Sequence, residues 1–233
     1  MSKETIDRIR FAVIPATTEH VGGYEVQVFV NEVEMTSRGA GMGMDPFELL
    51  YPVNLLRATP EPVRVPIARC GCGVYGCSET DVIIQRDEWS VTWIWDKKVP
   101  GPHARIFADE YDAAVQELLD DHSWEEPVDT AMRLISTGLD HRKLAAEGFA
   151  LEWQWPDVDA DRLRVALSWG DYQVFLDVRH VGREPGDIVD EVLQLLAEPA
   201  YSWPVSYHHI PGGTARPAVA GPGWIPFRFE GAS

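Results

Sequence analysis

The stretch Cys70-Gly71-Cys72-Gly73-Val74-Tyr75-Gly76-Cys77 contains all three cysteines of the chain and three of its nineteen glycines. The segment before it, Val63 to Ala68, predicts a strand, and the segment after it, Thr80 to Trp95, predicts a β-hairpin. Glycine readily adopts the backbone conformations that a tight turn requires. We therefore expect this stretch, called the knuckle below, to join two strands and to bring its thiols toward one another.

Three clustered thiols suggest a metal site, because zinc is bound tetrahedrally by cysteine and histidine side chains. Residues two apart on a strand share a face, and the knuckle glycines would let the third cysteine fold back toward the first two. A fourth ligand would have to come from outside the knuckle. The candidate metal ligands are Cys70, Cys72, Cys77 and His103, with His122 and His141 as less favoured alternatives to His103.

The spacing of these cysteines leaves three interpretations open. Common zinc sites use C-x2-C pairs, whereas this stretch reads C-x-C-x4-C and has no histidine nearby in the sequence. Reduced cysteines packed under a tight turn are preferred, since buried cysteines are usually inert. The alternatives are a structural zinc ion, which is the one cofactor that the sequence suggests, and a redox or catalytic thiol.

Composition and charge restrict the classes of partner. The chain has 233 residues, 45% of them hydrophobic, so it can form one large domain or two small ones. Its formal charge of −17 is spread along the whole chain. This charge argues against nucleic-acid binding, which needs a basic footprint. It permits attraction to a basic protein partner, although an acidic surface that serves solubility alone is the preferred explanation.

The N-terminal residues and the cysteines indicate a compartment. Residues 1–10 carry charges but no apolar segment of a secretory signal, and no apolar run reaches the length of a membrane span. An odd number of clustered cysteines is not a secreted disulfide framework. We expect a cytoplasmic protein that does not associate with membranes.

Hydrophobic periodicity predicts an α+β fold, with antiparallel hairpins and a three-stranded meander each covered by helices. The Gly39–Gly43 segment is expected to be a flexible connector, and Pro66 is expected to place its strand at a sheet edge. The expected domains are residues 1–122, which include the knuckle, residues 123–210 with the meander, and an irregular Pro/Gly-rich tail of residues 211–233 lying partly on the surface.

Two rows of alternating residues are expected to face a buried core. The first consists of Trp89, Val91, Trp93 and Trp95, and the second of Phe149, Leu151, Trp153 and Trp155. The helices predicted to cover the sheets span residues 108–121, 128–137 and 187–197.

Other polar clusters fail as sites. Asp157, Asp159 and Asp161 imitate the start of a calcium loop, but the required glycine and glutamate are missing, so a solvated turn is expected. His208 and His209 would point to opposite faces of a strand, which disfavours joint metal binding. No nucleotide-binding, hydrolase or metalloprotease motif is present in the sequence.

The knuckle also carries a resemblance. C-x-C-G-x-x-G-C, followed by Val91-Thr-Trp93 and then Phe107-Ala-Asp-Glu-Tyr111, resembles a family of uncharacterised bacterial proteins, mainly actinobacterial. The strand Val28 to Asn31 is similar as well, and the likeness covers roughly residues 22–120. The members often have a tryptophan after the third cysteine, where this chain has Ser78. The resemblance implies no activity.

Two functions follow as hypotheses. A non-enzymatic binding protein, such as an immunity-like inhibitor of a basic toxin, agrees with the acidic charge and the lack of catalytic motifs. The alternative is a zinc- or thiol-dependent enzyme centred on Cys70, Cys72 and Cys77. The binding protein is preferred over the enzyme.

Overall fold

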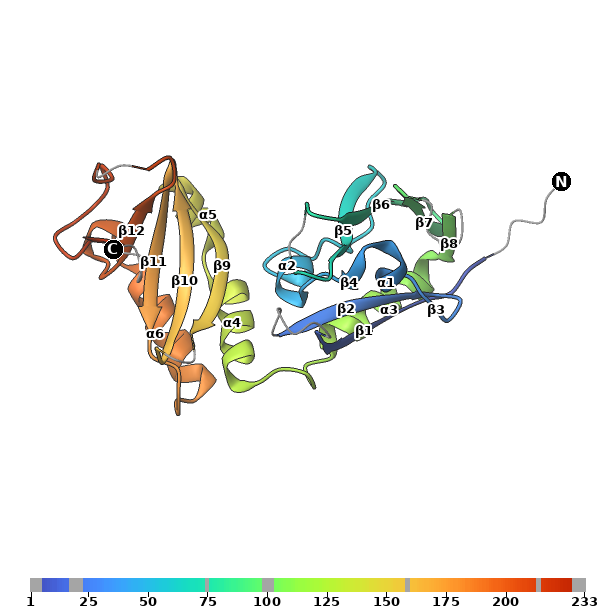
Figure 1. Cartoon of the computed structure of the whole chain (residues 1–233), viewed down its shortest axis with the longest axis horizontal. Helices are drawn as coiled ribbons and strands as arrows, with labels where there is room; N and C mark the ends of the chain where they lie inside the picture. Colours follow the sequence, from blue (N-terminus) through green and yellow to red (C-terminus); the bar gives the residue numbers. More distant parts are fainter. Residues whose placement is uncertain are drawn as a thin grey trace. The chain divides into compact units, whose positions relative to one another are not determined.

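The computed structural model describes residues 6–16, 23–73, 76–97, 103–157, 160–212 and 215–227. The chain divides into two compact units, Met1–Trp124 and Glu125–Ser233. Both units combine helices with mainly antiparallel sheets, which makes the fold α+β as expected (Figure 1). Trp124 belongs to the first unit, because its ring lies 5.1 Å from that of Tyr24 and 5.7 Å from that of Phe47.

A three-stranded sheet begins the first unit. Its strands follow one another in the order β1 (Ile9–Pro15), β2 (Tyr24–Val30) and β3 (Val33–Glu34). The turn between β2 and β3 uses Asn31 and Glu32 at φ values of 49° and 64°. Two successive positive φ values match the tight hairpin turn that the sequence predicts there.

A five-stranded antiparallel sheet completes the first unit and contains the knuckle. Its order is β4-β5-β6-β7-β8, and the short helices α1 (Thr36–Gly39) and α2 (Pro46–Leu50) flank β4 in the chain. The five strands are β4 (Gly41–Gly43), β5 (Val63–Cys70), β6 (Glu79–Arg86), β7 (Ser90–Trp95) and β8 (His103–Phe107).

Two predictions for this sheet are wrong. The Gly39–Gly43 segment is not merely a flexible connector, because Gly41–Gly43 forms β4 and pairs with residues 68–70 of β5. Consequently β5 is not an edge strand, although it contains Pro66. The proline is tolerated because the pairing of β5 with β6 shifts register between Pro66 and Ala68, and because β4 is too short to reach Pro66.

The core of the first unit lies where both sheets meet α3 (Ala108–Asp120). Val91, Trp93 and Trp95 are buried there as predicted, and Tyr111 of α3 donates a hydrogen bond to the Leu56 carbonyl at 2.6 Å. Trp89 does not share this core. It precedes β7 in the turn and is 72% exposed, since the alternation starts only where the strand starts.

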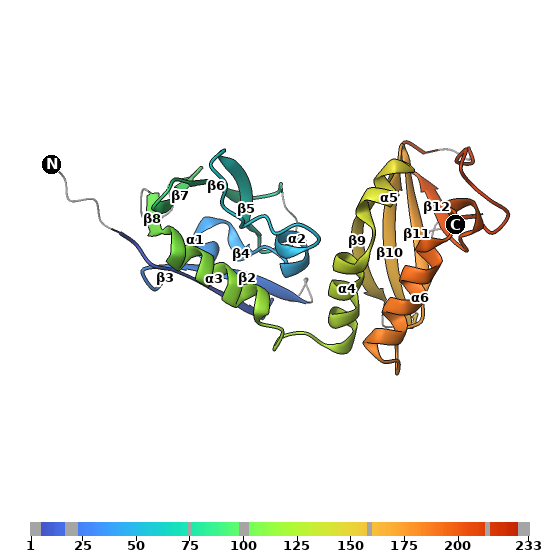
Figure 2. The same cartoon turned by 180° about the vertical axis from the view of Figure 1, so that it is seen from behind.

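The second unit is a five-stranded sheet with helices on one face (Figures 1 and 2). The sheet order is β13-β12-β11-β10-β9, so the predicted meander is present and is extended by two further strands. The elements are α4 (Pro127–Gly138), α5 (His141–Ala146), β9 (Phe149–Asp157), β10 (Arg162–Trp169), β11 (Tyr172–Val178), α6 (Pro185–Ala197), a 3-10 turn (Ala200–Ser202), β12 (Ser206–His209) and β13 (Ile225–Pro226).

A β-bulge overturns the predicted face of β9. The register with β10 shifts between Ala166 and Leu167, and from there the alternation of β9 is inverted. Trp153 is therefore 40% exposed and Trp155 61% exposed, instead of facing the helices. Gln154 takes the inward position and donates from Nε2 to the Met132 carbonyl at 2.9 Å and to Ser136 Oγ at 2.7 Å, both on α4.

The tail expected to be irregular contains a short strand and a buried tryptophan. Residues 215–227 of it are described, and Ile225–Pro226 pairs in parallel with β12. The Trp224 side chain is only 3% exposed, is stacked on Trp203 and donates from Nε1 to the Ala200 carbonyl at 2.9 Å. This part of the tail is thus integral to the second unit.

Candidate metal centre

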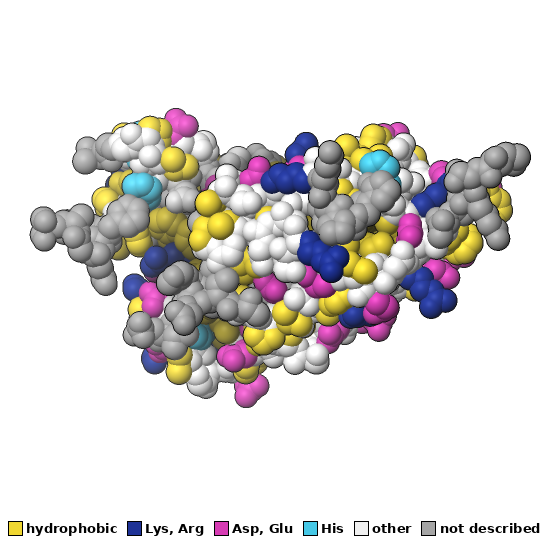
Figure 3. Space-filling model, turned by 45° about the vertical axis from the view of Figure 1, so that its right-hand side comes forward, with side chains coloured by type: hydrophobic (Ala, Val, Ile, Leu, Met, Phe, Trp, Pro, Cys, Tyr) yellow, Lys and Arg dark blue, Asp and Glu magenta, His cyan; other side chains and the backbone are white. Residues whose placement is uncertain are grey.

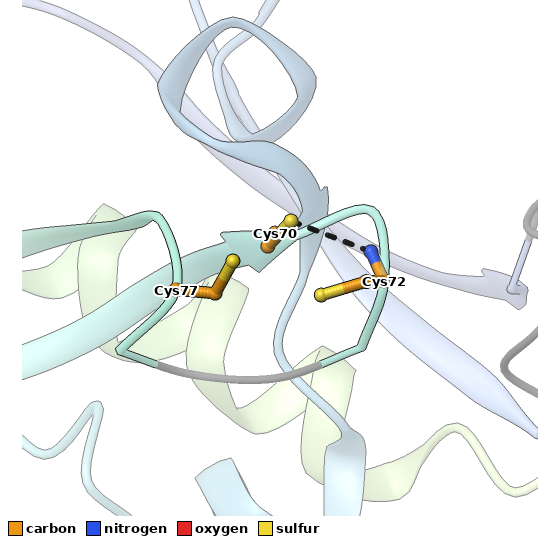
Figure 4. Close-up of side chains that lie close together, drawn as sticks. All are labelled: Cys70, Cys72 and Cys77. Carbon is orange, nitrogen blue, oxygen red and sulfur yellow. Dashed lines mark hydrogen bonds between the residues drawn. The ribbon is translucent and has the colours of Figure 1, made fainter.

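The knuckle joins β5 to β6 and brings the three cysteines together (Figure 4). Cys70 is the last residue of β5, whereas Cys72 and Cys77 lie in the connection to β6. Their ligand sulfur atoms all lie within 4.8 Å of one another. The structure therefore forms, from residues close in sequence, a cluster of three soft donor atoms.

Glycine conformations and backbone hydrogen bonds shape the described part of the knuckle. Gly73 and Gly76 adopt φ values of 85° and 94°, which residues with a Cβ rarely adopt. The Gly73 N–H donates to the Cys70 carbonyl at 2.8 Å and closes the first turn. The Cys72 N–H then donates to Sγ of Cys70 at 3.5 Å, drawn dashed in Figure 4. An amide aimed at sulfur stabilises the thiolate form that a metal requires.

The burial of these thiols does not match the interpretation as packing residues. Cys70 is half-buried, but Cys72 and Cys77 are exposed. An exposed side chain adds little to the stability of the fold, because little of its apolar surface is removed from water. The preference for inert cysteines packed under a turn is therefore wrong for two of the three.

Mutual contact of the thiols controls their protonation. The pKa of Cys77 is raised from 9.0 to about 11 because its thiol is hydrogen-bonded to those of Cys70 and Cys72. Repulsion between thiolates raises this pKa further. At neutral pH Cys77 is consequently a protonated thiol, and it gives up its proton readily only when a cation offsets the accumulated negative charge.

The donor set fits a zinc ion. Zinc–sulfur bonds of about 2.3 Å in a tetrahedron place the sulfur atoms about 3.8 Å apart. Sulfur atoms within 4.8 Å of one another need to approach by no more than about 1 Å to reach that spacing. Small side-chain rotations in an exposed loop suffice for such an approach.

The predicted fourth ligand does not join the cluster. His103 is an exposed residue at the start of β8, three strands away from β5, which corresponds to about 14 Å across the sheet. His122 follows α3, and His141 lies in the second unit with Nε2 at 2.7 Å from the Ser136 carbonyl. Within the described ranges, the group suited to hold an ion consists of the three cysteines without any of these histidines.

The other polar clusters have structural partners. Asp161 pairs with Arg179 at 2.8 Å, and Asp157 accepts a hydrogen bond from the Ala160 N–H at 3.0 Å. Asp159 lies outside the described residues. His209 packs against Tyr172, with ring centroids 4.8 Å apart, and its Nδ1 lies 2.5 Å from the Gly212 carbonyl oxygen. These contacts agree with a turn and a strand rather than with metal ligation.

The acidic side chains are spread over the face drawn in Figure 3, and four of them line one groove on α6. Basic side chains lie among them. A shallow groove of about 580 Å³ on α6 contains Asp187, Asp190, Glu191 and Glu198, and Arg183 pairs with Glu191 at 2.6 Å inside it. None of the helices in the described ranges has the length and apolar character that a membrane crossing requires.

Comparisons of the chain with protein-family models, with curated proteins and with solved structures gave no match. The resemblance of the knuckle to an uncharacterised bacterial family therefore stays a prediction.

Proposed function

We propose that the first unit is a zinc-binding module in which Cys70, Cys72 and Cys77 hold the ion as thiolates, and that the protein is a non-enzymatic binding protein. The observation that supports this most directly is the convergence of three ligand sulfur atoms within 4.8 Å. Thiolates are preferred ligands of zinc, and a structural zinc ion contributes directly to the stability of the fold. The ion would fix the connection between β5 and β6, where backbone pairing ends.

The alternative of a thiol-dependent enzyme has weaker support. A nucleophilic cysteine works as a thiolate and depends on a lowered pKa, usually through a nearby cation or histidine. Cys77 has a pKa raised to about 11 instead, because two neighbouring thiols surround it. The close approach of the three thiols favours metal binding instead, since a divalent cation is attracted by every thiolate that forms.

Metal analysis tests the proposal. Protein purified in reductant should contain close to one zinc ion per chain, and zinc added to the chelated protein should raise its thermal midpoint, as expected for a ligand of the native state. Cys72→Ser should lose both effects. Ser78→Ala, an exposed neighbour of Cys77, serves as the matched control and should behave like the wild type. Wild-type protein that binds no zinc and gains no stability from it would refute the proposal.

A basic protein partner is a second part of this proposal. It is supported by the net charge of −17 alone. Affinity purification from the native host, washed at increasing ionic strength, should retain a basic protein that leaves at high salt. Recovery of no basic protein at low salt would contradict this part.

A further inference from the structure

The three knuckle cysteines differ in their exposure to solvent. Cys72 and Cys77 are exposed and lie in the connection between β5 and β6, whereas Cys70 is half-buried at the end of β5 (Figure 4). Exposed thiols are open to reagents in solution, and a second thiol close by converts the first product into a disulfide. The knuckle therefore offers a second chemistry besides metal binding.

Backbone pairing restrains Cys70 more than the two exposed cysteines. Cys70 pairs with Gly41 of β4, and a Cβ on Gly41 would lie 3.1 Å from the backbone nitrogen of Gly71. The sulfur of Cys70 also accepts the hydrogen bond from the Cys72 N–H. Cys72 and Cys77 belong to neither of the strands that the knuckle joins. Because disulfide geometry is specific, the pair with fewer backbone restraints reaches it at the lower cost.

The sulfur atoms of Cys72 and Cys77 are within reach of one another. They are separated by at most 4.8 Å, whereas a disulfide bond is about 2.0 Å long. Figure 4 shows both side chains directed toward the inside of the knuckle. Rotation of both side chains, together with a small backbone shift at either cysteine, supplies the remaining approach of about 3 Å without separating β5 from β6.

We propose that Cys72 and Cys77 form a reversible disulfide that excludes the metal ion, with a small disulfide such as oxidised glutathione as the oxidant. One exposed thiolate attacks a sulfur of the small disulfide, whose S–S bond breaks and releases one small thiol. The second protein thiolate attacks the mixed disulfide, forms the protein S–S bond and releases the other small thiol. The two protein thiols are thereby oxidised, the small disulfide is reduced, and the two protein protons pass to the released thiols.

Oxidation and zinc binding compete for the same sulfur atoms, so the regulatory part of this inference rests on the proposed zinc site. Zinc is held by thiolates, and a bond between Cys72 and Cys77 leaves only Cys70 as a thiolate donor of the cluster. One thiolate holds zinc far more weakly than three. Oxidation should therefore release the ion, and bound zinc should protect the thiols. The knuckle then binds the ion in the reduced protein only.

Glutathione mixtures of defined composition test the disulfide. Metal-free wild type and its single Cys→Ser variants are equilibrated in them, quenched with acid and alkylated, and the alkylated thiols are counted by mass spectrometry. Wild type should lose two of its three thiols, and Cys70→Ser both of its remaining thiols, at similar glutathione ratios. Cys72→Ser and Cys77→Ser should form no internal disulfide at that ratio. Ser78→Ala, the matched control, should behave like the wild type.

Two results would overturn the proposed disulfide. The first is a wild-type protein that keeps three free thiols, or that carries glutathione without an internal disulfide. The second is an internal bond that joins Cys70 to either of the other cysteines. Peptide mapping of the oxidised wild type identifies the bonded pair directly, so this result does not depend on the folding of any variant.

Zinc separates failure of this inference from failure of the zinc site. Free zinc, held by a chelator buffer at about a hundred times its Kd, should raise the ratio of oxidised glutathione to the square of reduced glutathione at half-oxidation about a hundredfold. If the reduced wild type binds no zinc yet forms the Cys72–Cys77 bond, the zinc site is wrong and the disulfide stands. If it binds zinc but forms no disulfide, or keeps the ion when oxidised, the zinc site stands and this inference fails.

Discussion

Gly43 of β4 lies so close to β2 that a Cβ on it would be 2.1 Å from the carbonyl oxygen of Val26. The backbone of the next residue, Met44, accepts a hydrogen bond from the Val26 N–H at 2.8 Å. This contact links the three-stranded sheet to the five-stranded sheet of the first unit. The glycine-rich segment can therefore form β4 beside β2 only because residue 43 has no side chain.

Gly43→Ala should destabilise the first unit by about 1–3 kcal/mol, because the new methyl group meets backbone rather than a movable side chain. Gly186→Ala is the matched control. A Cβ at Gly186 meets nothing within 4 Å, so this substitution should leave stability unchanged or slightly increased. Chemical denaturation followed by circular dichroism compares the two variants, and equal stabilities would contradict the close packing of β2 and β4.

Periodicity and turn chemistry predict most of the secondary structure, and they predict that the knuckle gathers its cysteines. They fail where one backbone irregularity moves the residues that follow it in the strand to the opposite face of the sheet. The bulge in β9 turns Trp153 and Trp155 from the predicted buried face to the exposed face, and the sequence of that strand contains no residue that predicts a bulge. The prediction of His103 as a ligand fails for a related reason. The order of the strands in the sheet, and not separation along the chain, determines the distance between His103 and Cys70.

Because of the bulge in β9, two aromatic residues of this strand should contribute very differently to stability. Phe149 is 1% exposed and Trp155 is 61% exposed. Phe149→Ala should cost about 3–5 kcal/mol by leaving a cavity in the core of the second unit. Trp155→Ala should cost less than about 1 kcal/mol, because little of the ring is removed from water. If both substitutions have the same cost in denaturation experiments, the alternation of β9 is not inverted.

Zinc binding should become stronger as pH rises through neutrality. The pKa of Cys77 is raised to about 11, so in the metal-free protein this thiol stays protonated well above neutral pH. Binding displaces that proton, so the apparent affinity should rise at least about tenfold per pH unit. Competition with a chelator of known affinity measures this slope. A pH-independent affinity would mean that Cys77 does not bind the ion as a thiolate.

Asp87 should stabilise the β6–β7 hairpin in a pH-dependent way. Its pKa is lowered to about 2, chiefly by the Trp89 N–H, with the Ser90 hydroxyl and N–H also donating to the carboxylate. The folded-state pKa lies below the unfolded value of about 3.9, so the stabilisation is complete above about pH 4 and is lost as pH falls toward 2. The stability difference between wild type and Asp87→Ala should shrink over that range. Glu88→Ala, the adjacent exposed acid, should show no such change.

Trp224 should hold the C-terminal segment onto the second unit. Its ring is 3% exposed and stacked on Trp203, and its Nε1 donates to the Ala200 carbonyl at 2.9 Å. Trp224→Ala should therefore cost about 3–5 kcal/mol and expose residues 215–227 to protease before the rest of the unit. Ile225→Ala, next along the chain but 62% exposed, should change neither stability nor cleavage. Unchanged cleavage of the Trp224 variant would mean that strand pairing through β13 alone keeps the segment in place.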